Sequence, residues 1–99
     1  MKVDREARVK ERLRTALDHV QSSIRSGGDA DHPVVQLEVA DRELSKMLAA
    51  LEDGALNRHK PSGLWHMITD SWPLRDALGE EIVAAELEFD RLSKLPRQR

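Results

Sequence analysis

The residues of this chain that are best suited to chemistry are its four histidines, which are candidates for metal binding or proton transfer. They are His19, His32, His59 and His66. The chain has no His-Glu-x-x-His motif and no Glu-x-x-His pair of the kind that di-iron bundles place on facing helices. Asp29 and Asp31 stand close to His32, but this grouping is more typical of a polar loop and helix cap than of a cation site. We therefore predict neither a metal site nor a cofactor.

Nucleophilic catalysis and phosphate transfer also lack the motifs that they need. The chain contains no cysteine, no Gly-x-Ser-x-Gly turn and no glycine-rich phosphate loop. The neighbouring acids Glu80 and Glu81, and likewise Glu86 and Glu88, are typical of a solvated helix face. No catalytic residue can be assigned, so we predict that the chain is not an enzyme.

A strip of basic residues near the start of the chain is its clearest charge feature. Arg5, Arg8 and Arg12 recur at helical spacing and project from one side of a helix, near His19. Such a strip is suited to binding nucleic-acid phosphates, so the alternative function is that of a nucleic-acid-associated regulatory protein. However, residues 76–90 are rich in acids, and the net charge of the chain is −2. We therefore favour mutual neutralisation of the two segments over polyanion binding.

The elements that position these residues are predicted by apolar periodicity. Three segments repeat apolar residues at steps of three and four, which places them on one side of an α-helix. These positions are Val9, Leu13, Ala16, Val20 and Ile24, then Leu37, Leu44, Leu48 and Leu51, then Leu74, Leu78, Ile82, Ala85, Phe89 and Leu92. The predicted fold is all-α, a small antiparallel bundle of three long helices plus one short helix in a single domain, 1–99. We expect helices at about 4–26, 33–53, 62–70 and 73–95, with glycines 27, 28 and 54 as stop signals. Gly79 stands inside the last helix, which suggests a close approach to its backbone.

Two of the long helices carry a second apolar pair, away from the main stripe. The pairs are Val35 with Val39, and Val83 with Leu87. Other parts of the same chain are one way to cover these pairs, and a second copy is the other. Because 99 residues with only 3% aromatics make a thin core, we predict a homodimer in which these four residues self-associate.

Both tryptophans lie in one short segment outside the long apolar stripes. Trp65, Met67, Ile68 and Trp72 are the candidate partner-binding residues, because tryptophan dominates interface hot spots and methionine adapts to varied surfaces. The alternative is that the rings close one end of the bundle. We expect one indole to stay accessible, and Trp65 is the better candidate, because Trp72 precedes Pro73 at a helix start.

These features favour a non-enzymatic protein–protein interaction module, such as an adaptor, an antitoxin or immunity-type protein, or a regulatory accessory protein. No apolar run approaches the ~20 residues that a membrane span requires. The first 14 residues are charged throughout, unlike a secretory signal. Since the absence of cysteine fits a reducing compartment, we predict a cytoplasmic protein with a protein partner and no membrane contact.

Overall fold

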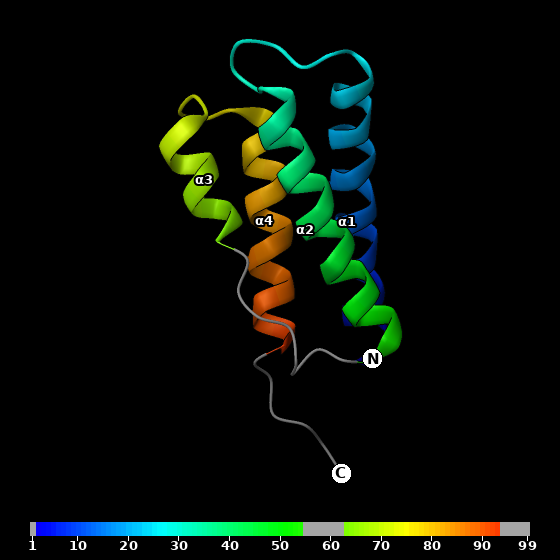
Figure 1. The fold of residues 1–99 in the computed structure, drawn as a ribbon. Helices are drawn as coiled ribbons and strands as arrows, with labels where there is room; N and C mark the ends of the chain where they lie inside the picture. Colours follow the sequence, from blue (N-terminus) through cyan, green and yellow to red (C-terminus); the bar gives the residue numbers. More distant parts are fainter. Residues whose placement is uncertain (1, 55–62, 94–99) are drawn as a thin grey trace.

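The computed structural model describes residues 2–54 and 63–93, which form four helices and no strand. The helices are α1 (Lys2–Arg25), α2 (Val34–Asp53), α3 (Leu64–Ser71) and α4 (Ala77–Ser93). They run alternately up and down, so that helices adjacent in the chain are antiparallel (Figure 1). This confirms the predicted all-α bundle of three long helices and one short helix. None of the helices described is both long enough and apolar enough to cross a bilayer.

The predicted ends of the first two helices agree with the structure to within two residues. After α1, Gly27 and Gly28 have φ of 89° and 69°, a left-handed conformation that only glycine adopts without steric cost. The backbone N–H of Gly28 donates to the carbonyl of Ser23 at 2.9 Å and so closes the helix end. Gly54, with φ of 70°, ends α2 in the same way.

The start of α4 differs from the predicted residue 73. Pro73 disfavours a helical backbone at the residue before it, and Trp72 is extended. A turn over Pro73–Asp76 follows, in which Arg75 has a φ of 63°. Helix α4 begins only at Ala77, because the carboxylate of Asp76 accepts the backbone N–H of Gly79 at 2.8 Å and acts as its N-cap. Leu74, which we expected in the core, therefore lies outside the helix and is 93% exposed.

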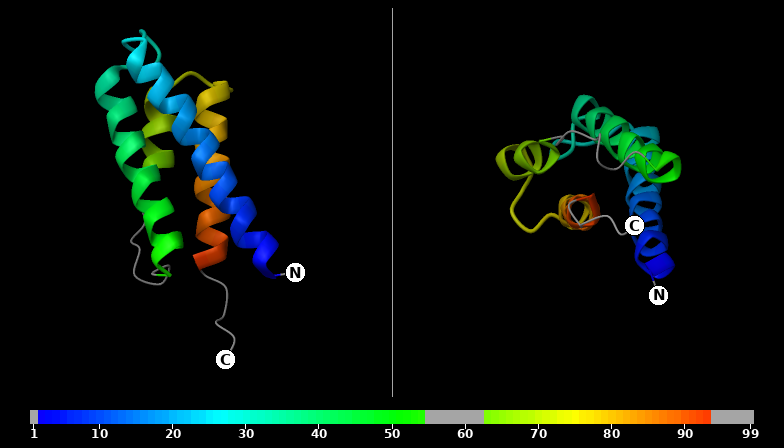
Figure 2. Two further views of the ribbon diagram at one scale, coloured as in Figure 1. Left: turned by 90° about the vertical axis from the view of Figure 1, so that its right-hand side faces the viewer. Right: turned by 90° about the horizontal axis from the view of Figure 1, so that it is seen from below.

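The core follows the predicted stripes over most of their length. Helix α1 packs against α2 and α4, and α4 also packs against α3, so that α4 lies between α1 and α3 (Figure 2). The largest fully buried side chains are Leu13, Val20, Leu37, Leu44, Met47, Leu64, Ile82 and Phe89. Met47 and Leu64 were not among the predicted stripe residues.

At Gly79 the backbone of α4 lies close to side chains of α3 and of the turn that follows it. A Cβ atom at this position would lie 2.9 Å from Ile68 Cγ2 and 3.3 Å from Trp72 Cε3. Both neighbours are buried, so neither has room to move away. The expectation that something approaches this backbone closely is confirmed.

This packing predicts that Gly79→Val destabilises the protein by about 2 kcal/mol, because the added side chain overpacks a closed contact. Ala77→Val is the matched control, since residue 77 lies on the same helix and is exposed. Its expected effect is below about 1 kcal/mol. Chemical denaturation of both variants measures the difference, and equal unfolding midpoints would contradict the close contact.

Candidate functional site

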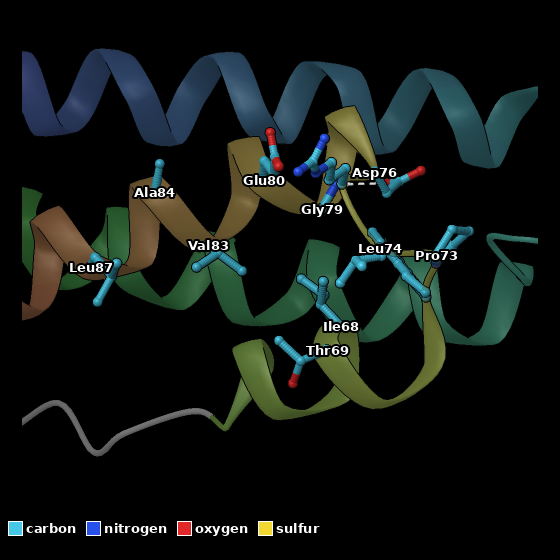
Figure 3. A pocket seen from close by; sticks show the side chains of 12 residues that line it. Ile68, Thr69, Pro73, Leu74, Asp76, Gly79, Glu80, Val83, Ala84 and Leu87 are labelled. Atoms are coloured by element: carbon cyan, nitrogen blue, oxygen red, sulfur yellow. Dashed lines mark hydrogen bonds between the residues drawn. The ribbon is translucent and has the colours of Figure 1, made fainter.

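A hollow of about 480 Å³ lies along the outer side of α3 and α4 (Figure 3). Its wall comes from the second half of α3, the turn that follows and one face of α4. The residues that line it are Ile68, Thr69, Trp72, Pro73, Leu74, Arg75, Asp76, Gly79, Glu80, Val83, Ala84 and Leu87. Buried apolar side chains from α3 form part of the wall, and half-exposed apolar side chains from α4 stand at the edge.

The hollow brings together residues from the two predicted interaction sets. Ile68 and Trp72 come from the predicted partner-binding segment, and Val83 and Leu87 from the predicted self-association pairs. Ile68 and Trp72 are 6% and 5% exposed, so they contribute to the wall of the hollow and present little surface of their own. Leu87 is 50% exposed and is the most accessible of the four.

The other four candidates lie away from the hollow. Trp65 is 46% exposed on α3, where its ring stacks on that of His66 with centroids 3.9 Å apart. Met67 is partly buried against the core. On α2, Val35 is 70% exposed and Val39 is half-buried.

The sequence missed the contribution of the α3–α4 turn to this site. Leu74 and Arg75 both line the hollow, yet we assigned them to a helix. The available signal was Asp76, a good N-cap residue three positions before Gly79. Starting the helix after Asp76, in place of the predicted start at residue 73, would have placed Leu74 and Arg75 in a turn.

Trp72 connects the end of α3 to the start of α2. Its indole N–H donates to Gln36 Oε1 at 2.7 Å. The ring meets that of His32 edge-on, with centroids 4.6 Å apart and an interplanar angle of 87°. The polar atom of this buried ring is therefore satisfied, and the ring fixes one end of the hollow.

His32 joins the α1–α2 connection to Asp76, the N-cap residue of α4. Its Nδ1 lies 3.1 Å from Asp29 Oδ1, and its Nε2 lies 2.9 Å from both carboxylate oxygens of Asp76. A neutral imidazole has only one N–H, whereas the imidazolium donates to both carboxylates at once. The geometry therefore favours the charged form of His32.

These contacts determine the direction in which the histidine titrates. Burial lowers the pKa of His32, but the hydrogen bond and charge of Asp76, with the charge of Asp29, outweigh it and leave the pKa raised. The two carboxylates face different nitrogens of the ring, so one ion cannot bind all three side chains. In the residues that the structure covers, no group of three or more histidine or acidic side chains is placed to hold a metal ion.

The basic strip of α1 is partly neutralised by α4, as we favoured. Arg12 Nε lies 3.0 Å from Glu88 Oε2, and His19 Nδ1 lies 2.6 Å from Glu81 Oε1. The hydrogen bond to Glu81 also raises the pKa of His19. Arg5 and Arg8 are exposed to solvent. The three arginines are therefore not equivalent, and Arg12 faces an acid that opposes polyanion binding.

The hollow is suited to apolar contact more than to acid–base chemistry. Its best-placed acid, Asp76, already accepts hydrogen bonds from His32 and from the backbone of Gly79. The comparisons with known proteins do not point to another chemistry, because no protein-family model, curated protein or solved structure matches the chain. Function has to be inferred from the surface itself.

The His32–Asp76 contact predicts a pH-dependent stability. The pKa of His32 is higher in the folded protein than the value of about 6.5 in the unfolded chain, so protonation stabilises the fold. This stabilisation is complete below the unfolded pKa and is lost as the pH rises through the folded pKa. We expect Asp76→Asn to lower the free energy of unfolding by about 1–2 kcal/mol at pH 5.5 and by less at pH 9. Asparagine still caps α4, so the cap is retained. Thermal unfolding at both pH values tests this, and an equal loss at the two would contradict it. His19 titrates in the same direction but does not contact Asp76, so it contributes equally before and after the substitution.

The unequal burial of the two indoles predicts two populations in fluorescence quenching by acrylamide. Trp65 should be quenched readily and Trp72 should be protected. Trp65→Phe should remove the accessible population while the melting temperature changes little. Trp72→Phe should lower the melting temperature, because it removes the hydrogen bond to Gln36 and the contact with His32. Uniform quenching of both rings would contradict the described packing.

Proposed function

We propose that this chain is a non-enzymatic protein–protein interaction module that pairs with a second copy of itself through the face of α4 beside the hollow. The observation that supports this is the apolar character of an open surface. Leu74 and Leu87 are 93% and 50% exposed, and they flank a hollow whose wall includes Ile68 and Val83. Exposed apolar side chains gathered around a concave surface are typical of an interaction site.

A second copy fits this surface because the surface has both parts of a contact. The hollow provides a concave apolar region, and Leu87 provides a protruding apolar side chain at its edge. Oppositely charged side chains, Glu80 and Arg91, stand on either side of Leu87 along α4. A twofold axis brings the same patch of both copies together, so a patch with these complementary features can pair with itself.

The nucleic-acid alternative has less support. All three arginines of the strip are exposed, but Arg12 already pairs with Glu88. A phosphate-binding surface gains affinity from several cations acting together, and an acid beside the strip reduces the local positive potential. We therefore keep protein association as the proposed function.

Self-association predicts an apparent mass that depends on protein concentration. In light scattering or sedimentation, the intact protein should exceed the 11.2 kDa of one chain at tens of micromolar and above. Leu87→Glu should remain at the monomer mass, because each copy would have to bury a charge in an apolar contact. We expect circular dichroism to show unchanged helix content, since residue 87 is half-exposed.

Val35→Glu is the matched control for this experiment. Val35 is also an exposed apolar residue on a helix, but it does not line the hollow. This variant should associate like the unmodified protein. A monomer produced by Val35→Glu and not by Leu87→Glu would move the interface to α2. A single 11.2 kDa particle at all concentrations would overturn the proposal.

A further inference from the structure

One face of α4 carries four residues at the spacing of a helix–helix seam. Glu80, Ala84, Leu87 and Arg91 are separated by steps of four, three and four, the repeat by which two helices pack along their length. Glu80, Leu87 and Arg91 are exposed and Ala84 is half-buried, and Val83 borders the same face. The ion pairs to α1 come from Glu81 and Glu88 on a different side of the helix. Within the part of the chain that the structure describes, the ion pairs between α1 and α4 therefore do not involve the seam residues.

From this spacing we infer that two copies pair through α4 in an antiparallel arrangement with a defined register; this inference rests on the proposed self-association. In that register, Ala84 of each copy lies opposite Leu87 of the other, and Glu80 lies opposite Arg91. The small side chain of Ala84 leaves space for the larger Leu87, so the apolar layers interdigitate. The twofold axis produces each of these contacts twice, so the surface is complementary to a second copy of itself.

The charges select the direction of the pairing. In the antiparallel register, each end of the seam holds a Glu80–Arg91 pair. A parallel register would place Glu80 against Glu80 and Arg91 against Arg91, so two attractive pairs become two repulsive ones. Neither residue takes part in an ion pair within 2–54 and 63–93. Both charges are therefore available to a second copy.

The hollow fits this arrangement because it borders the same seam. It continues the apolar surface from Leu87 and Ala84 toward Ile68 on α3 (Figure 3). A helix laid along α4 would contact the wall of α3 on one flank. Contact with α3 would add buried apolar area to a single helix pair, whose own area is small for a stable interface.

Because the chain has no cysteine, introduced cysteines report the register without interference. An equimolar mixture of Glu80→Cys and Arg91→Cys proteins should form a mixed disulfide under mild oxidation, because the two Cα atoms face each other. Glu80→Cys alone should form at least about fivefold less disulfide than the mixture. In the antiparallel pair, residue 80 of one copy lies 11 residues along the seam from residue 80 of the other, about 16 Å at 1.5 Å per residue, which is too far for a disulfide. Arg91→Cys alone should behave in the same way. Cross-links in the separate proteins and not in the mixture would overturn the inference in favour of a parallel pair.

A charge exchange tests the same register without oxidation. Glu80→Arg should weaken association by about tenfold, because two arginines then face each other at both ends of the seam. Combining it with Arg91→Glu restores opposite charges and should recover most of the affinity. Glu38→Arg, the same charge change at an exposed position of α2, should leave the association unchanged.

The outcomes separate this inference from the proposed function. A dimer that Leu87→Glu disrupts, but that shows neither the mixed disulfide nor recovery by charge exchange, supports the proposed function and overturns the antiparallel register. A protein that remains a monomer at all concentrations overturns both. Mixed cross-linking together with charge-exchange recovery supports both.

Discussion

One polar junction, in which His32 lies between Asp29 and Asp76, ties the start of α4 to the connection before α2. Helix α4 packs mainly against α1 and α3, so its relation to α2 needs another link. The imidazole supplies that link, because it reaches from the start of α2 to the residue that caps α4. Trp72 strengthens the junction from the same side through its contact with the His32 ring. The His32–Asp76 contact is part-buried, whereas Asp29 is exposed, and a charged hydrogen bond shielded from water is stronger than one at the surface. The contact with Asp76 is therefore the stronger of the two that His32 makes.

The open face of α4 is a consequence of this arrangement. Because α1 packs on one flank of α4 and α3 on the other, the side of α4 between them has no helix packed on it among residues 2–54 and 63–93 (Figure 2). Gly79 lets α3 approach closely at one end of the helix, and the turn through Leu74 closes that end of the hollow. The apolar side chains on this face are the ones that the proposed pairing would bury.

The sequence predicted the helices and most of the core because both depend on local periodicity. Burial of Leu13, Leu44 and Phe89 follows from their spacing alone. The site was predictable only in part, because it is made by segments that are distant in the chain. Val83 and Leu87 could be identified as a second stripe, but nothing in the sequence indicates that they share a hollow with Ile68. The bond between His32 and Asp76 spans 44 positions and has no local signal. The start of α4 was predicted wrongly because Pro73 and Asp76 both suit the beginning of a helix, and the choice between them depends on tertiary contacts.

Apolar and charged side chains have different roles in the proposed pairing. Leu87 and the wall of the hollow provide burial, which is nearly independent of direction along the helix. Glu80 and Arg91 are exposed, so their attraction is modest and weakens as salt screens it. That modest attraction still distinguishes an antiparallel pair from a parallel one, because reversing one helix replaces two attractive contacts with two repulsive ones. Affinity is therefore expected to come from the apolar layers, and orientation from the charges at their ends.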